Sequence, residues 1–325
     1  MTCNWLGKGL MAAGRLFFDQ RSFLAVIVAL AVVGMATGSW ADDAERTSPE
    51  PQAGWEPYFA LGFDVQIQSL DASFESDTIP TLYTPVDPET GQPLIDPETE
   101  DPIIVCCDPT VVTSVADSGS GTVTPPMVGI ELGVLSPTLV ENKWRPRLFL
   151  RARGEFPTTG SRNIKRTNTP ILQVSKKIEY SAAYLIGGGI DLELPTDGRR
   201  VGLRVSVDYF RIDFRPRVDV EISEVIDPSS PFFTEPVFRG TGSGDRAYQG
   251  IAPGLTVEAF LGRRGKLGFS LYSEALAMII LGDRTHSVGV QNEIGSGSGT
   301  YRVTADSVAY QVGAGIRVSW QGLGK

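Results

Sequence analysis

The chain has 325 residues, a net charge of -9 and a charged fraction of 21%, with 36 glycines and 22 prolines. It has three cysteines and one histidine, His286, which excludes histidine-cluster metal sites and enzymes that rely on paired imidazoles. Its one long apolar run, 23–35, is shorter than the roughly 20 residues of a membrane-spanning helix, which excludes a polytopic helical protein. The acidity argues against a nucleic-acid partner, because phosphates would be repelled.

Residues 1–41 have the pattern of a cleaved signal peptide. A basic stretch precedes the apolar run 23–35, and Ser39 and Ala41 provide small residues before a cleavage site. The alternative is an uncleaved N-terminal membrane anchor, which the shortness of the run disfavours. We therefore expect a mature chain that begins with a periplasmic segment, 42–55.

The rest of the chain alternates apolar and small or polar residues in eight segments, which is the pattern of half-buried strands. These segments are 58–68, 127–134, 147–153, 182–194, 201–209, 254–261, 267–274 and 308–320. The continuation of the seventh, 275–281, is apolar throughout and blurs the phase. An even number of strands of this length is typical of barrels that span an outer membrane.

Connections of alternating length favour the same fold. Tight turns are expected at 195–199 and 262–265, and longer connections at the other ends of the strands, the longest being the acidic loop 70–126. The sequence thus predicts an all-β protein, a closed antiparallel up-and-down transmembrane β-barrel over 56–320 with a C-terminal tail, 321–325. The alternative has ten strands, with an additional hairpin from 103–115.

Charged residues occupy the face opposite the apolar one, and we expect them to form a paired charge network in a narrow lumen. They are Asp64, Glu131, Arg151, Arg153, Asp191, Glu193, Arg204, Asp208, Glu258, Glu274 and Arg317. The glycines 187–189 continue this alternation and leave room for large side chains such as Arg151 or Arg204. A soluble β-sandwich could also expose such a face to water, so the leader, the loops and the terminal aromatic residues decide for the membrane.

The leader and the last strand resemble those of the small outer-membrane β-barrel proteins of Gram-negative bacteria, the family typified by eight-stranded barrels. The last strand is similar to that family's assembly signal through Tyr310, Val312, Ile316, Val318 and Trp320. It departs from the pattern because residues 321–325 follow the closing aromatic residue. The resemblance implies a location in the outer membrane, contact with its lipid, and assembly by periplasmic chaperones and the barrel-assembly machinery.

The long first loop contains two further features. Cys106 and Cys107 are adjacent, and three states compete: a vicinal disulfide that stiffens the loop, which we favour, an intermolecular bond, or two free thiols. The repeated Asp-Pro-Glu-Thr at 87–90 and 96–99 could bind calcium or a basic partner. It lacks the spacing of a calcium loop, so we expect a solvated acidic loop with no metal.

His286, Ser287 and Glu293 are residue types found in catalytic triads, but adjacent strand residues point to opposite faces. We therefore expect no enzyme and no cofactor. The sequence favours a structural or surface-interaction barrel that displays its acidic loop to an unknown extracellular partner. The alternatives are a narrow pore or carrier of a small apolar ligand and, third, a lipid-modifying enzyme.

Overall fold

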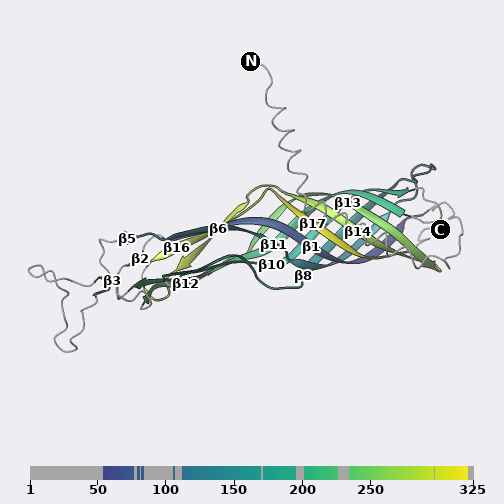
Figure 1. The fold of residues 1–325 in the computed structure, drawn as a ribbon. Coiled ribbons are helices and arrows are strands. Elements are labelled where there is room, and N and C mark those ends of the chain that lie inside the picture. The colour runs from purple at the N-terminus through teal and green to yellow at the C-terminus, as the bar shows by residue number, and fades with distance from the viewer. Residues whose placement is uncertain are drawn as a thin grey trace, which may run out of the picture.

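The structure is a computed structural model that describes residues 54–320 apart from 77–78, 81, 84–104, 107–111, 170, 195–200, 226–233 and 296. It is elongated, with a barrel at one end and a long extension at the other (Figure 1). In the described residues, no helix has the length and apolar character needed to cross a membrane. The expected signal peptide 1–41, most of the expected periplasmic segment 42–55, the expected turn 195–199 and the expected tail 321–325 lie outside the described residues.

In the described residues, eight strands build the barrel, and nine others lie beyond it. The barrel strands are β1 (Glu56–Ser76), β7 (Pro126–Leu135), β8 (Arg147–Pro157), β10 (Leu172–Leu194), β11 (Val201–Val225), β13 (Arg246–Arg264), β14 (Leu267–Ile280) and β17 (Val308–Trp320). The others are β2 (Ile79–Pro80), β3 (Leu82–Tyr83), β4 (Val105–Cys106), β5 (Val112–Thr113), β6 (Ala116–Val123), β9 (Arg162–Asn168), β12 (Thr234–Ser243), β15 (Thr285–Gln291) and β16 (Ser298–Ala305).

The barrel is closed and antiparallel. Its strands pair in the order β1-β7-β8-β10-β11-β13-β14-β17, and β17 pairs back onto β1 from Tyr58↔Ser319 to Ile67↔Tyr310. Closure leaves no free edge in this sheet, as a strand-built membrane span requires. The prediction of eight strands in an all-β antiparallel barrel is confirmed, and the ten-strand alternative is not adopted by the described residues.

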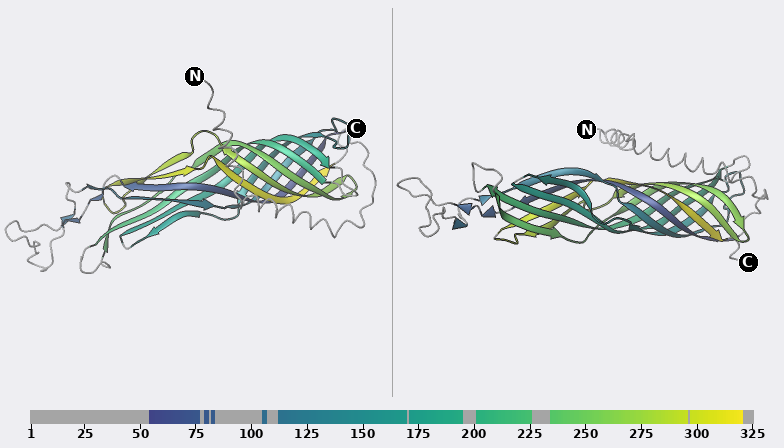
Figure 2. Two further views of the ribbon diagram at one scale, coloured as in Figure 1. Left: turned by 45° about the horizontal axis from the view of Figure 1, so that its top comes forward. Right: turned by 60° about the horizontal axis from the view of Figure 1, so that its bottom comes forward.

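The barrel strands β1, β10 and β11 continue into the extension (Figure 2). There they pair with shorter strands to form two four-stranded sheets. One sheet has the order β15-β16-β1-β6, and the other has the order β9-β10-β11-β12. Polar contacts join the two sheets: the Lys176 ammonium on β10 lies 2.5 Å from the Asp117 carboxylate on β6, and the Asn292 amide oxygen accepts from the Arg239 backbone N–H at 3.1 Å. The extension is therefore a β-sandwich stacked on the barrel.

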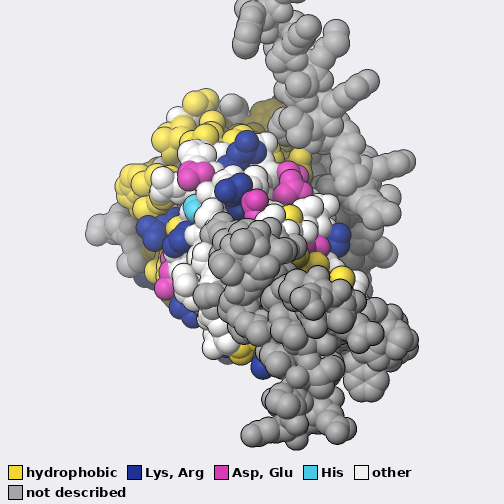
Figure 3. Space-filling view, turned by 90° about the vertical axis from the view of Figure 1, so that its left-hand side faces the viewer, with side chains coloured by type: hydrophobic (Ala, Val, Ile, Leu, Met, Phe, Trp, Pro, Cys, Tyr) yellow, Lys and Arg dark blue, Asp and Glu magenta, His cyan; other side chains and the backbone are white. Residues whose placement is uncertain are grey.

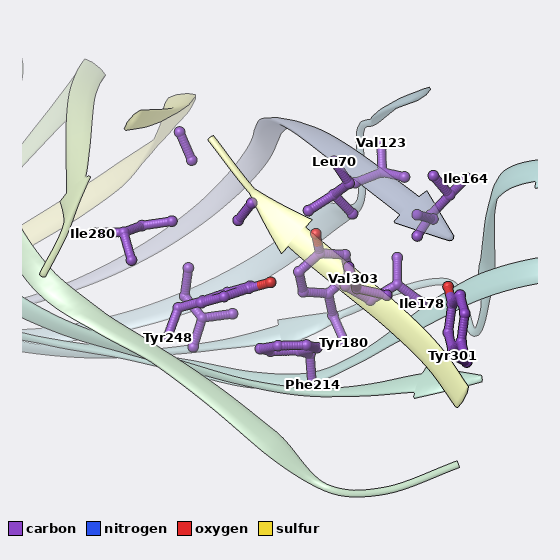
Figure 4. Close-up of a cluster of buried hydrophobic side chains, with 14 of the residues drawn as sticks. Leu70, Val123, Ile164, Ile178, Tyr180, Phe214, Tyr248, Ile280, Tyr301 and Val303 are labelled. Atoms are coloured by element: carbon purple, nitrogen blue, oxygen red, sulfur yellow. The ribbon is translucent and has the colours of Figure 1, made fainter. Parts of the chain in front are cut away.

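Apolar side chains fill the space between the two sheets of the extension (Figure 4). Phe214 and Tyr248 stack there with ring centroids 4.3 Å apart, and Leu70, Tyr301 and Val303 are fully buried beside them. Burial of side chains of this size is the main source of stability in such a core. The extension therefore has a hydrophobic core of its own.

The inner and outer faces exchange polarity at one level of the molecule. Along β11 the inward side chains change from Arg204, Ser206 and Asp208 to Phe210, Ile212 and Phe214. The outward ones change at the same level from Val205, Val207 and Tyr209 to Arg211, Asp213 and Arg215. The barrel is thus polar inside and apolar outside, whereas the extension is the reverse. Figure 3, which views the extension end, shows basic, acidic and uncharged side chains mixed on its visible surface.

This exchange explains the apolar stretch 275–281, in which the alternation could not be followed. Leu276, Met278 and Ile280 point inward toward the extension core, whereas Ala275 and Ala277 remain on the apolar outer wall. On β14, unlike β11, the inner face becomes apolar at Leu276 while the outer face stays apolar through Ile279, so both faces are apolar over this stretch. A β-bulge between Tyr180 and Ala182 shifts the register of β10 near the same level.

Much of what the sequence suggested as connections is strand in the structure. β1 continues to Ser76, and β6 begins at Ala116, both inside the expected first loop 70–126. The other longer connections likewise contain strands β9, β12 and β15 and the start of β16. Their reversed polarity, with apolar residues inward and polar residues outward, differs from the pattern followed in the barrel.

Candidate functional site

The barrel interior contains many buried charged side chains. Of the eleven charged residues predicted for the lumen, nine are buried: Asp64, Glu131, Arg151, Arg153, Asp191, Arg204, Asp208, Glu274 and Arg317. Glu258 also faces inward, with a side chain 15% exposed. Glu193 lies at the barrel end that carries the β13–β14 turn, hereafter the turn end, and its carboxylate is 3.7 Å from Arg145.

The Arg151 side chain connects four strands through hydrogen bonds. From β8, its guanidinium donates to both Asp208 carboxylate oxygens on β11, at 3.0 and 2.7 Å. It also donates to Glu131 on β7 at 3.3 Å and to Glu274 on β14. A planar guanidinium that makes bidentate bonds fixes its partners in direction as well as in distance.

Gly187 makes the Arg151–Asp208 pair possible. Gly187 on β10 is the register partner of Arg151 on one side and of Asp208 on the other. A Cβ on Gly187 would lie 2.6 Å from the Asp208 carboxylate and 2.3 Å from the Val207 carbonyl oxygen. The ion pair therefore crosses β10 where β10 carries no side chain.

Arg153 forms a second center beside Arg151. Its guanidinium lies 2.7 Å from Glu155 and 2.7 Å from Glu274, and it also contacts Asp64 on β1. The two arginines thus share Glu274, which connects them into one network. Glu155 is fully buried but was not among the predicted residues, because the alternation was followed only to Arg153.

Two further arginines pack on aromatic rings near the turn end. Arg204 and Arg317 lie 4.9 and 4.7 Å from the ring center of Tyr58. Arg204 pairs with Asp191 at 2.8 Å and with Glu258 at 3.1 Å, and Arg317 also contacts Glu258. A cation over an aromatic face in a desolvated site adds to the ionic attraction.

Arg147 and Glu56 complete the network at the turn end, and neither was predicted. Arg147 lies 2.9 Å from Glu56 and 2.7 Å from Asp191. Every arginine of the interior thus contacts carboxylates from more than one strand. Together they fill the lumen with paired side chains instead of lining an open channel, as expected for a barrel of this size.

Glutamine side chains separate the charged interior from the extension core. The Tyr180 hydroxyl donates to Gln68 at 2.6 Å, and the Gln311 amide donates to Glu155 at 2.6 Å. Uncharged polar groups thus lie between the ion pairs and the first apolar layer. The change from charged to apolar interior is graded over this layer.

The residues of the proposed assembly signal lie on β17 with their side chains on the outer wall. Ile316 is 52% exposed and Trp320 is 42% exposed. Cys106 ends the short strand β4, while Cys107 and the repeats at 87–90 and 96–99 lie outside the described residues. The described part of the chain contains no cluster of three or more His, Cys, Asp or Glu residues able to hold a metal ion.

His286 points into the edge of the extension core. Its ring center is 5.4 Å from that of Phe214 and 5.1 Å from that of Tyr248, and its Nε2 is buried without a hydrogen-bond partner. Ser287, the next residue, is exposed on the opposite face. The Glu293 carboxylate accepts from the Thr241 hydroxyl at 3.3 Å. The structure therefore does not assemble His286, Ser287 and Glu293 as a catalytic triad.

We expect His286 to make the stability of the extension depend on pH. Burial lowers the pKa of His286 from 6.5; the nearby Asp283 opposes this shift and Arg246 adds to it. As pH falls below about 6.5, the unfolded chain binds a proton that the folded chain resists, so folding loses stability until the folded pKa is passed. Hydrogen exchange of β15 and β16 at about pH 7.5 and pH 5 measures this loss. His286→Phe should flatten the pH dependence, and an unchanged dependence would contradict the assignment.

Fold and interior together define a class of protein: a closed eight-stranded antiparallel barrel with an apolar outer wall and a lumen filled by ion pairs. This is the architecture of the small outer-membrane β-barrels.

The chain has only low similarity to known proteins. No protein-family model and no curated protein matches the chain. Among solved structures, Ail, the attachment invasion locus protein of Yersinia pestis, is 9% identical, with 81% of this chain and 98% of Ail covered and a TM-score of 0.27. The outer membrane protease OmpT of Escherichia coli is 8% identical, with coverage of 86% and 99% and a TM-score of 0.21.

The translocator domain of the autotransporter NalP of Neisseria meningitidis is 10% identical, with 92% of this chain and 98% of that domain covered and a TM-score of 0.29. With identities and TM-scores this low, these structures support no argument about what the chain does. The functional conclusion therefore depends on the chain's own geometry.

Proposed function

We propose that the chain is an outer-membrane barrel that anchors a β-sandwich outside the cell and serves in surface interaction. The observation that carries the proposal is the exchange of face polarity along β11, from Val205, Val207 and Tyr209 to Arg211, Asp213 and Arg215 on the outer face. An apolar outer wall is stable in lipid, whereas a charged one is stable in water. The level between Tyr209 and Arg211 is then the membrane boundary.

The lipid-facing stretch has the length that a spanning strand needs. On β1 the outward residues from Phe59 to Ile67 are apolar, and on β11 those from Val201 to Tyr209 are apolar or aromatic. About 9–11 residues cross a bilayer as a tilted strand. Trp55, Trp144 and Trp320 lie near the turn end, where interfacial tryptophans are expected.

The orientation follows from the lengths of the two ends. Short turns face the periplasm in this class of barrel and long segments face outward. The β13–β14 turn is short, whereas the extension, into which β1 continues as far as Ser76, lies at the other end. We therefore assign the extension to the outside of the cell, where it presents a mixed-charge surface and the acidic loop to a partner.

This proposal includes no catalytic or transport activity. The lumen is occupied by the ion pairs of Arg151 and Arg153 with their carboxylates, which argues against a pore. The extension core is packed with apolar side chains, which argues against a carrier for a small apolar ligand. Assembly by the barrel-insertion machinery through the outward residues of β17 belongs to the same proposal.

Membrane fractionation with semi-native electrophoresis tests the proposal. We expect recovery in the outer-membrane fraction and a mobility that differs between boiled and unboiled samples, because a closed barrel resists unfolding in detergent without heat. Recovery in the soluble periplasmic fraction would mean that the apolar wall is covered by protein instead of lipid, and it would overturn the proposal.

A further inference from the structure

An apolar groove of about 980 Å³ runs along the outer wall of the barrel in its turn half. Its sides are formed mainly by Trp55, Leu132, Leu148, Leu150, Ile186 and Ile190. Leu150 is 64% exposed, and Ile186 is 61% exposed. The volume lies at the upper end of the roughly 300–1,000 Å³ range of sites that hold small molecules.

Small residues on two neighbouring strands create the groove. Ala152 on β8 is the register partner of Ile186, and Gly188 on β10 is the register partner of Leu150. A Cβ on Gly188 would lie 2.2 Å from the Phe149 carbonyl oxygen, so β8 and β10 approach too closely there for a side chain. The wall is therefore low at Ala152 and Gly188, beside the protruding side chains of Ile186 and Leu150.

The turn end of the groove meets a polar segment. The Trp144 carbonyl oxygen accepts a hydrogen bond from the Glu193 N–H at 2.8 Å. The chain just before β8 therefore lies beside the last residues of β10, which follow Ile190. Lys143 lies 5.6 Å from the Trp144 ring center, and Arg145 lies 3.7 Å from Glu193. With Glu141, this segment presents both signs of charge beside an interfacial tryptophan.

We propose that the groove holds an acyl chain of a zwitterionic phospholipid from the periplasmic leaflet. The apolar sides accept the chain, while Lys143 and Arg145 face the phosphate and Glu141 and Glu193 face the ammonium group. This inference rests on the proposed function, since it requires the outer wall to lie in lipid. A second copy of the chain is a poorer occupant of the groove, because a twofold dimer would place the two grooves face to face and leave both unfilled.

Quenching of tryptophan fluorescence by brominated acyl chains tests the inference in the refolded full mature chain. Trp144→Phe with Trp320→Phe leaves Trp55, which lines the groove. Trp55→Phe with Trp144→Phe leaves Trp320, which lies on the outer wall but does not line the groove. We expect brominated phosphatidylethanolamine to quench Trp55 more than an equal fraction of brominated phosphatidylglycerol does, and to quench Trp320 without preference.

Filling the groove provides the matched control. Ala152→Leu places a larger side chain in it and should roughly halve the quenching of Trp55, whereas Ala314→Leu, on the outer wall of β17, should leave that quenching unchanged. The inference would be overturned if the quenching of Trp55 depended neither on the lipid headgroup nor on Ala152→Leu. It would also be overturned if a second copy of the chain protected Trp55 from quenching by lipid. An unquenched Trp320 would instead overturn the membrane embedding itself.

Discussion

Replacing Arg151 with alanine is expected to reduce the free energy of unfolding by about 3–5 kcal/mol, as expected when one partner of a buried ion pair is removed. Its side chain is 1% exposed and contacts Glu131, Asp208 and Glu274, so the variant leaves three carboxylates without this cation in the lumen. Urea titration of the protein refolded in lipid vesicles measures the change, and the boiled-against-unboiled mobility shift should occur at a lower temperature.

Two variants show whether geometry or charge is responsible. Arg151→Lys keeps the charge but loses the bidentate contact with Asp208, so we expect an intermediate loss. Arg211→Ala removes an arginine whose ion pair with Asp213 lies on the exposed outer face, and we expect no measurable change. If Arg151→Ala unfolds at the same urea concentration as Arg211→Ala, the lumen contains water that screens these charges.

Phe214→Ala is expected to destabilise the extension while the barrel remains folded. Phe214 is 1% exposed and stacks on Tyr248, and removal of a buried phenylalanine costs about 3–5 kcal/mol through lost burial and the cavity that remains. Because the ion pairs of the lumen are untouched, limited proteolysis should remove parts of the extension. The protected barrel should still show its heat-dependent mobility.

Phe156→Ala provides the control for Phe214→Ala. Phe156 is 50% exposed on the outer wall, so its removal leaves no cavity and should not make the extension sensitive to protease. If Phe214→Ala abolishes the mobility shift together with the extension, the two parts unfold as one cooperative unit. If it changes neither, the apolar cluster between the two sheets is not a stabilising core.

The barrel could be predicted from the sequence because one alternation decides both faces of each strand. Asp64, Arg204 and Arg317 were assigned to the lumen from phase alone, and the structure buries all three. Their partners could not be predicted, since the Arg151–Asp208 pair spans β10 and depends on the register of three strands. Glu155 continues the phase of Arg151 and Arg153, so following the pattern two residues further would have found it.

The extension could not be predicted because its strands follow other rules. β6, for example, reads Ala-Asp-Ser-Gly-Ser-Gly-Thr-Val, which offers almost no apolar alternation and resembles a loop. Its place is set by pairing with β1, from Gln68↔Val123 to Glu75↔Ala116. Such strands owe their conformation to tertiary pairing more than to local preference.

The central claim is that one level of the molecule separates a wall in lipid from a wall in water outside the cell. Single cysteines on the outward face of β11 test it most directly, in a chain with Cys106→Ser and Cys107→Ser. On intact cells, a membrane-impermeant maleimide should label Arg211→Cys and Arg215→Cys but not Val205→Cys or Val207→Cys. Equal labelling of Val205→Cys and Arg215→Cys, or labelling of neither, would contradict the account.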